Sequence, residues 1–182
     1  MFLGKNKKKG FTLTEVLLVL ALAAIIIIII FMSYPKVRAG QQVETESKNI
    51  ATMQAGVRSL YSATANYAGL TNQIAIKANL IPDNMLQNSD GETILNSWKG
   101  AVTISSDGNT HSGEDDSGFY IRYVRLMPEA CSRLVTSVAG SFYEINVNGT
   151  TVKDSGGQLD LTKTTTACSI TGSGNYVLFY SE

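Results

Sequence analysis

The sequence predicts an α+β fold, in which a long N-terminal helix packs on an antiparallel β-sheet. Three observations support this prediction: an uninterrupted apolar run of 17 residues at 16–32, an amphipathic helical pattern after it, and short strand-like runs separated by turn residues beyond residue 98. The length of 182 residues suffices for one ordinary domain with one appended element.

The charge is balanced overall but uneven along the chain. There are 15 Lys and Arg residues and 15 Asp and Glu residues, and four lysines lie in the first ten positions. Without those ten positions the count is 11 basic against 15 acidic residues, or −4. A nucleic-acid-binding domain is usually basic, so no specific nucleic-acid partner is predicted. One histidine and two cysteines cannot form a four-ligand zinc site of the usual kinds. The composition therefore indicates a membrane-inserted or exported protein.

The first element is a helix long enough to span a membrane. Residues 11–32 carry one charge, Glu15, and 22 helical residues extend about 33 Å, the thickness of a bilayer core. The preceding lysines retain the N-terminus in the cytoplasm, so the chain after residue 32 is exported. The alternatives are a plain signal anchor and a conventional signal peptide cleaved before Gly40. The length of the apolar run, the acid within it and the basic Lys36 and Arg38 argue against that cleavage.

Glu15 is the most informative residue of this helix. A carboxylate within a membrane span costs about 2.5–3.5 kcal/mol and therefore usually has a partner. In one interpretation Glu15 lies at the headgroup level, where it also favours the helix dipole. In the other, cleavage between Gly10 and Phe11 creates a cation at the same depth, the α-amine of Phe11.

Residues 1–15 resemble the class III signal of type IV prepilins: a basic leader, Gly10, Phe11, Glu15 at the fifth place after the glycine, and an apolar run. In that family a membrane peptidase cuts after the glycine and N-methylates the new terminus. The resemblance implies a leader peptide at 1–10, cleavage between Gly10 and Phe11, methylation of Phe11, and a role for Glu15 in subunit assembly. Pseudopilins of type II secretion and minor pilins share this signal.

The helix is expected to continue to residue 62, with 11–34 forming the membrane or filament core and 35–62 an amphipathic half. The apolar stripe that packs under the sheet has helical spacing and consists of Val43, Ile50, Met53, Val57, Leu60 and Thr64. Pro35 and Gly40 interrupt the middle, so we expect a kink or a short unwound stretch near 30–35.

Residues 63–182 are expected to form a globular head. A loop with short helical turns covers about 68–98, and a helix covers about 128–139, with Pro128 in its first turn. Strands are expected at 101–105, 119–126, 142–148, 150–153, 158–163, 166–170 and 176–180. Asn148 and Gly149 form a hairpin turn between two of them.

The head is similar to type IVb pilins. Residues 131–138 and 142–147 resemble toxin-coregulated pilin around its first cysteine, and 70–72 with 78–85 resemble the thin-pilus pilins of conjugative plasmids. The resemblance implies the type IV pilin fold with a disulfide-closed C-terminal region. The ten-residue leader and Phe11 follow the type IVa style instead, which leaves both kinds of peptidase and assembly machine as candidates.

The two cysteines are 37 positions apart in the part that we expect to be exported. A disulfide between Cys131 and Cys168 fits that compartment, whereas two free buried thiols would fit a cytosolic protein. Closing this loop would stabilise the head by up to about 3.8 kcal/mol in the chain-entropy model. The pilin resemblance implies the same disulfide.

No catalytic site, cofactor or metal site is predicted. His111 is the only histidine and has no nucleophile beside it in the sequence. The acidic run Asp107, Asn109, Glu114, Asp115 and Asp116 hints at calcium, but its spacing fails the EF-hand pattern, so we interpret it as a solvated loop. The sequon that begins at Asn148 is better explained by the hairpin turn.

The resemblance therefore implies a major structural subunit of a type IVb pilus, used for adhesion, aggregation or mating-pair contact. Its partners would be further copies of itself, a prepilin peptidase, an assembly ATPase, an inner-membrane platform protein, minor pilins and an outer-membrane secretin. It would reside in the inner membrane, with the N-terminus cytoplasmic and the head periplasmic, and then in an extracellular filament. A pseudopilin or minor pilin is one alternative. A monomeric membrane-anchored periplasmic binding domain, which would need neither Gly10 cleavage nor Glu15, is another.

Overall fold

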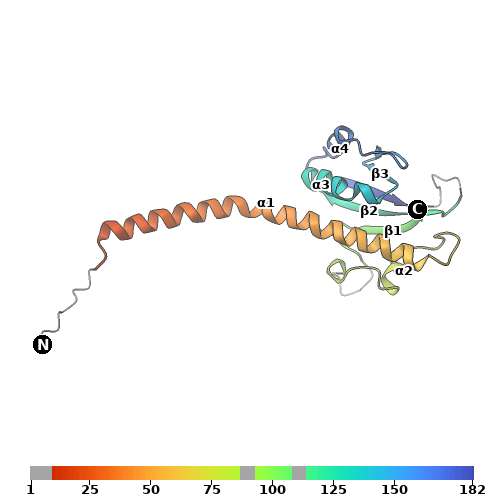
Figure 1. Ribbon diagram of the computed structural model, residues 1–182, viewed down its shortest axis with the longest axis horizontal. Helices are drawn as coiled ribbons and strands as arrows, with labels where there is room; N and C mark the ends of the chain where they lie inside the picture. Colours follow the sequence, from red (N-terminus) through yellow and green to blue (C-terminus); the bar gives the residue numbers. More distant parts are fainter. Residues whose placement is uncertain (1–9, 87–92, 108–113) are drawn as a thin grey trace, which may run out of the picture. The chain divides into compact units, whose positions relative to one another are not determined.

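The computed structural model describes residues 10–86, 93–107 and 114–182, without the side chains of 32, 33, 35 and 36. It confirms an α+β fold with an N-terminal helix and one antiparallel five-stranded sheet (Figure 1). The chain forms two compact units, Met1–Gly40 and Gln41–Glu182, and the sheet lies in the second.

Helix α1 (Leu13–Leu60) is 48 residues long and crosses the boundary between the two units. It is assigned as α-helix without interruption through residue 35, so the expected unwound stretch near 30–35 is not present. A proline inside a helix removes one backbone hydrogen bond and crowds the carbonyl four residues earlier, at a cost of about 3 kcal/mol, but this cost does not interrupt α1. The helix ends two residues before the expected boundary at 62.

The C-terminal part of α1 carries the apolar stripe into the core. Val43, Ile50, Met53 and Val57 are all buried, as expected. The prediction was wrong for the last two residues of the stripe, which do not belong to the packed face. Leu60 is 43% exposed, and Thr64 lies in the turn after the helix. The helical spacing therefore predicts the packed face correctly but not where that face ends.

The sheet has the strand order β1-β2-β5-β3-β4, and every neighbouring pair is antiparallel. Its strands are β1 (Val102–Asp107), β2 (Gly118–Leu126), β3 (Glu144–Val147), β4 (Thr150–Lys153) and β5 (Asn175–Ser181). The last strand in the chain, β5, thus lies in the middle of the sheet. Its burial alternates strictly, and the buried residues Val177 and Phe179 belong to the core. Asn148 (φ 51°) and Gly149 (φ 85°) form the β3–β4 turn in the left-handed conformation that such hairpins require.

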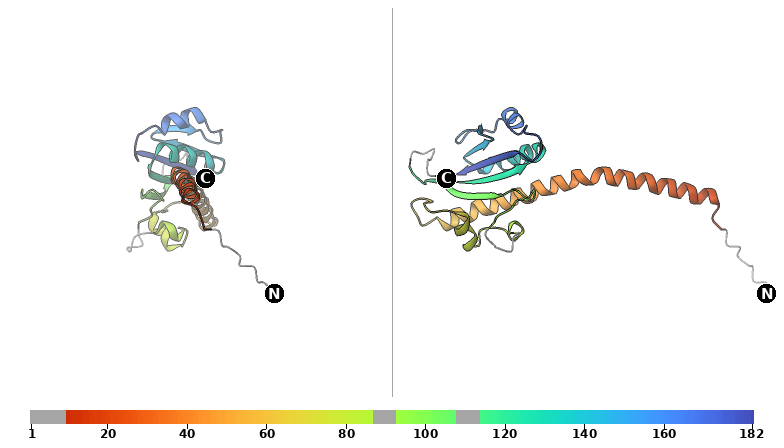
Figure 2. Two further views of the ribbon diagram at one scale, coloured as in Figure 1. Left: turned by 90° about the vertical axis from the view of Figure 1, so that its left-hand side faces the viewer. Right: turned by 180° about the vertical axis from the view of Figure 1, so that it is seen from behind.

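Helix α3 (Pro128–Val138) packs beside the C-terminal part of α1 over the buried face of the sheet (Figure 2). The two helices touch through the hydroxyls of Ser47 and Ser137, which are 2.6 Å apart. A short 3₁₀ turn, η2 (Ala139–Ser141), leads from α3 towards β3. The buried Lys153 of β4 donates to the carbonyls of Ala139 and Phe142 and so satisfies acceptors that follow the helix.

The segment between α1 and β1 contains α2 (Asn72–Lys77) and the 3₁₀ turn η1 (Asp83–Met85). This agrees with the expected loop with short helical turns at 68–98. Leu70, Ala75, Ile81, Met85 and Ile94 from this segment are buried in the core. The loop is therefore a packed part of the head.

Two of the expected strands, 158–163 and 166–170, are wrong. Most of that region forms the helix α4 (Leu161–Ala167). The carboxylate of Asp160 caps the helix by accepting from the Lys163 amide at 2.9 Å. Several threonine hydroxyls in α4 donate to carbonyls four residues earlier. Threonine favours strands in general, and this local bonding outweighed that preference here.

Candidate functional site

The predicted cleavage site lies just outside the start of α1. Gly10 and Phe11 are exposed and not helical, Thr12 precedes the first helical residue, and α1 begins at Leu13. The Gly10–Phe11 bond is therefore separated from the helix by one residue. A peptide bond in this position has no intrahelical hydrogen bonds to break before it can enter a protease.

Thr12 and Glu15 form a capping box at the start of α1. The carboxylate of Glu15 accepts from the Thr12 amide at 3.1 Å and from the Thr12 hydroxyl at 3.2 Å. In return, the Glu15 amide donates to the Thr12 hydroxyl oxygen at 3.3 Å. This reciprocal arrangement satisfies backbone donors at the start of the helix. Glu15 thus has local donors in the subunit itself, which the sequence analysis did not identify although Thr12 and Glu15 have capping-box spacing.

The helix that follows has the properties of a membrane span. Leu13–Phe31 is long and apolar enough to cross a bilayer, and none of that window is buried inside the protein. Its large apolar side chains are each about half exposed or more, including Leu17, Leu20 and Ile28. Surface of this kind must be covered by lipid or by protein.

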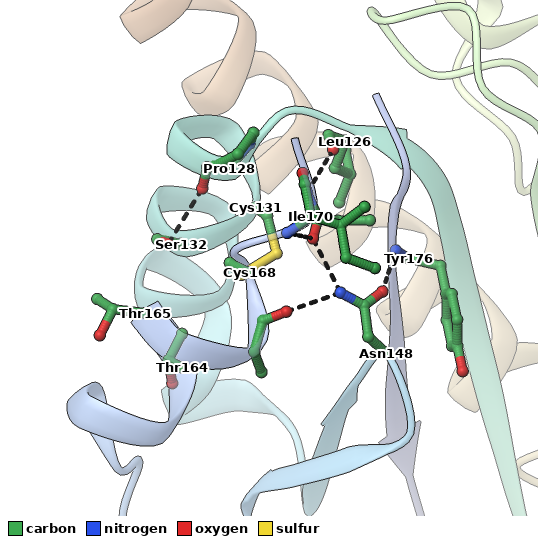
Figure 3. The surroundings of a disulfide bond; sticks show 12 residues. Leu126, Pro128, Cys131, Ser132, Asn148, Thr164, Thr165, Cys168, Ile170 and Tyr176 are labelled. Carbon is green, nitrogen blue, oxygen red and sulfur yellow. Dashed lines mark hydrogen bonds between the residues drawn. A yellow bond between two sulfur atoms is a disulfide. The ribbon is translucent and has the colours of Figure 1, made fainter. Parts of the chain in front are cut away.

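The predicted disulfide is present. Cys131 of α3 is bonded to Cys168, the residue that ends α4, with a Cα–Cα distance of 5.8 Å (Figure 3). Both cysteines are buried. The two cysteines are 37 residues apart in the chain, and their bond links α3 to the C-terminal end of α4 and encloses β3, β4 and α4.

Two asparagine side chains hold the segment around Cys168 against the sheet (Figure 3). Asn148 donates to the carbonyl oxygen of Ala167 at 2.7 Å and to the Asn175 side-chain oxygen at 2.8 Å. Asn175, which is fully buried, donates to the carbonyls of Leu126 and Ile170 at 2.9 Å each. This network explains Asn148 better than glycosylation does, because its amide nitrogen already donates within the protein.

Glu46 is a buried carboxylate that the sequence analysis missed. One of its oxygens accepts from the amide of Ser97 at 2.7 Å and from the Ser97 hydroxyl at 2.5 Å. The other accepts from the hydroxyl of Tyr123 at 2.9 Å. Glu46 thereby joins three parts of the head: α1, the segment before β1, and β2.

The environment of this carboxylate affects its neighbour. Burial, reinforced by the negative charge of Glu46, raises the pKa of Tyr123 well above its ordinary value. The sequence did contain a signal for Glu46. The apolar stripe jumps seven residues from Val43 to Ile50, and a helix needs an intermediate buried residue at 46 or 47.

Several predicted features fall outside the described residues. His111 and Asn109 lie in 108–113, so the expectations for that histidine and for much of the acidic run stay predictions. Within the ranges that the structure does describe, no group of three or more His, Cys, Asp and Glu side chains is arranged to hold a metal.

Two family models match the chain. The model for the N-terminal part of PilS matches residues 40–182, and the model of the prokaryotic N-terminal methylation motif matches residues 5–31. The major structural subunit of the bundle-forming pilus of Escherichia coli O127:H6 is 25% identical over 193 aligned positions, which cover 99% of this chain and 97% of that protein. Prepilin peptidase-dependent protein A of Clostridium perfringens is 34% identical over 68 positions, covering 37% of this chain and 49% of that protein.

Two solved structures share the fold. The type IVb pilin of Salmonella typhi matches with a TM-score of 0.60 and 20% identity, over 75% of this chain and 97% of that structure. TcpA, a type IV pilin of Vibrio cholerae El Tor, matches with a TM-score of 0.55 and 18% identity, over 78% of this chain and 99% of that structure.

Proposed function

Because the chain belongs to the PilS family of type IVb pilins, we propose that it is the major structural subunit of a type IV pilus. The observation that carries the proposal is the 19-residue apolar helix surface at Leu13–Phe31, which the protein itself leaves uncovered. In the inner membrane, lipid covers this surface. In a filament, the same helices of neighbouring subunits cover one another, so one surface serves both states.

The first step is processing. Residues 1–10 form the leader, and the peptidase cuts between Gly10 and Phe11 and methylates the Phe11 amine. The exposed, non-helical position of both residues supports this step. The mature chain then consists of an N-terminal segment at 11–62, in which α1 spans Leu13–Leu60 and 11–34 is the membrane or filament core, and the head at 63–182.

The second step is assembly, which depends on Glu15. A bundle of apolar helices buries this carboxylate, and a buried charge without a partner is costly. In the single subunit the Thr12 amide and hydroxyl already bond it. These are neutral donors, whereas the α-amine of Phe11 is a cation with a reference pKa of about 7.7–8. The amine of the last subunit added is the partner that Glu15 of an incoming subunit gains, and the pairing sets the axial register.

Other components follow from the family. The subunit is inserted in the inner membrane with its N-terminus cytoplasmic and its head periplasmic. The assembly ATPase, the platform protein, minor pilins and the secretin then deliver it to an extracellular filament. The named function of the Escherichia coli relative supports a bundle-forming, and so adhesive or aggregative, fibre. Mating-pair contact is the other use that the sequence resemblance implies.

The test is microscopy of sheared surface material from strains that express one pilin variant each. Wild-type cells should yield filaments whose main band begins at N-methylated Phe11 by intact-mass analysis. Replacing Gly10 with a bulky residue should leave full-length precursor in the membrane. Mature protein that begins at residue 1, 2 or 40, or wild-type cells that have abundant processed protein and no filaments, would contradict the proposal.

Two substitutions at Glu15 separate its charge from its capping role. Glu15→Gln keeps the capping box, because glutamine can accept the same bond, whereas Glu15→Val removes both. Both variants should be inserted, processed and folded, and both should lose filaments. Normal filaments from Glu15→Gln with none from Glu15→Val would show that the cap, and not the charge, is required.

A further inference from the structure

The outer edge of β1 is closed by side-chain and loop groups instead of a strand. β1 is the terminal strand of the sheet, so one edge has no neighbouring strand. Three of its amides nevertheless donate to acceptors in the segment between α1 and β1. These bonds are Val102 to the Ile94 carbonyl at 2.9 Å, Ile104 to the Asn72 side-chain oxygen at 2.7 Å, and Ser106 to the Leu70 carbonyl at 3.4 Å.

Asn72 makes the central contact. Its side-chain nitrogen donates to the Val102 carbonyl at 3.0 Å, while its side-chain oxygen accepts from the Ile104 amide at 2.7 Å. Val102 and Ile104 flank Thr103, and a residue of a parallel neighbouring strand would bond to these same two positions. The side-chain amide of Asn72 therefore takes the place of the N–H and C=O groups of one residue of a sixth strand.

Helix α2 holds this side chain in place. Asn72 is the first residue of α2, and the Thr71 hydroxyl caps the helix by accepting from the Ile74 amide. Ala75, three residues further along the helix, is buried in the core. The position of Asn72 on the edge is thus fixed by packing as well as by its two hydrogen bonds.

An uncovered β1 edge would readily pair with another chain. Unpaired amides and carbonyls on an edge strand act as a template, and β1 begins with three β-branched residues, Val102, Thr103 and Ile104. The identical edge of a second copy is a self-complementary partner, since two antiparallel edges can pair about a two-fold axis.

We propose that Asn72 closes the β1 edge against β1 of a second copy of this chain. The heads then cannot associate by pairing of their β1 strands. The importance of this edge closure to the cell rests on the proposed function, because a filament brings many heads close together. The edge closure itself can be tested in the purified full chain, whether or not filaments form.

The experiment compares Asn72→Ala with Gln73→Ala, an exposed neighbour in the same helix, in detergent-solubilised full-length chains. Sedimentation velocity over a concentration series should show association of Asn72→Ala beyond the wild-type chain, while Gln73→Ala matches it. Hydrogen exchange at the Ile104 amide should be about tenfold faster or more in Asn72→Ala, the factor expected from losing one hydrogen bond. Unchanged association and exchange would overturn the proposal.

A second variant tests where the association occurs. Thr103→Lys places a charge on the β1 edge, a substitution that natural sheets use to prevent edge pairing. Adding it to Asn72→Ala should restore wild-type sedimentation, and association that persists would place the contact elsewhere and refute the proposal. If Asn72→Ala does not fold, the proposal is tested instead by the rate of hydrogen exchange at the Ile104 amide of the wild-type chain. An Ile104 amide that exchanges as fast as the exposed Gln73 amide is not held by Asn72.

Discussion

Replacing Glu46 with glutamine should destabilise the head far more than its small change in shape suggests. The two side chains have nearly the same volume, but glutamine has one oxygen where glutamate has two. The single oxygen can accept from Ser97 or from Tyr123, and the amide nitrogen must then face the remaining donor.

The magnitude follows from the bonds that are lost. Hydrogen bonds to a charged group contribute about 1.5–3 kcal/mol each, and stranding a buried donor costs about 1–3 kcal/mol. Glu46 accepts four hydrogen bonds, including a long one of 3.4 Å from the Asn49 side chain, and Glu46→Gln removes the charge from all four and loses at least one bond entirely. We expect the free energy of unfolding to fall by roughly 2–4 kcal/mol. For a unit of this size that lowers the melting temperature by roughly 5–15 °C.

The only tryptophan in the chain provides the assay, because Trp98 follows Ser97 and packs against the core. Urea unfolding followed by Trp98 fluorescence and by far-ultraviolet circular dichroism should show both transitions shifted together. Glu44→Gln is the matched control, since the Glu44 side chain is exposed on the same helix and its carboxylate pairs with the exposed Lys48 one turn further along. It should leave both transitions where they are.

A double-mutant cycle tests the reasoning directly. Tyr123→Phe removes one donor, so Glu46→Gln should cost less in that background than in the wild-type chain. Equal costs in the two backgrounds, or a Glu46→Gln transition identical to that of Glu44→Gln, would show that the buried bonds do not determine stability here.

Three further predictions concern other parts of the head. Cys131→Ser should lower the free energy of unfolding, measured by urea titration, by up to about 3.8 kcal/mol. It should also reduce the amount of pilin detected by immunoblot. Freely alkylated thiols in denatured, non-reduced wild-type protein would exclude the bond. β2 shifts its register against β5 between Tyr123 and Leu126. Gly100→Ala should destabilise the head by roughly 1–3 kcal/mol, because an added Cβ would overlap the carbonyl of Val124 at this irregularity. A thermal melt identical to wild type would contradict this. The raised pKa of Tyr123 means that the unfolded chain loses this proton first, so the contribution of Tyr123 to stability should be constant below about pH 10 and decrease above it. Tyr123→Phe should weaken that alkaline decline in urea titrations, and an unchanged slope would assign it to other groups.

Much of the fold could be predicted because the relevant patterns are local. The apolar run from Val16 predicted the long apolar helix, helical spacing predicted the buried residues Val43, Ile50, Met53 and Val57, and Asn148 with Gly149 predicted the hairpin. These features depend on neighbours in sequence or one helical turn away. The cysteine pair was predictable because only one pairing within the chain exists.

The failures have a common cause, which is that side chains compete for the same backbone groups. In 158–170 the threonines suggested strands, but Asp160 and their own hydroxyls support a helix. At Glu46 a charged residue occupies a core position, because Ser97 and Tyr123 supply donors from 51 and 77 residues away. The gap in the apolar stripe between Val43 and Ile50 indicates that a buried residue lies between them, but it does not identify donors this far away in the sequence.

The central position of β5 determines when the sheet can be completed. β5 lies between β2 and β3, so the β1–β2 hairpin and the β3–β4 hairpin cannot join until residues 175–181 are available. Until then the apolar faces of both hairpins have no common core to pack into, and the Cys131 thiol waits for its partner at 168. The sheet is therefore completed by the last of its five strands in the chain, and loss of β5 would leave two separate hairpins in place of a head.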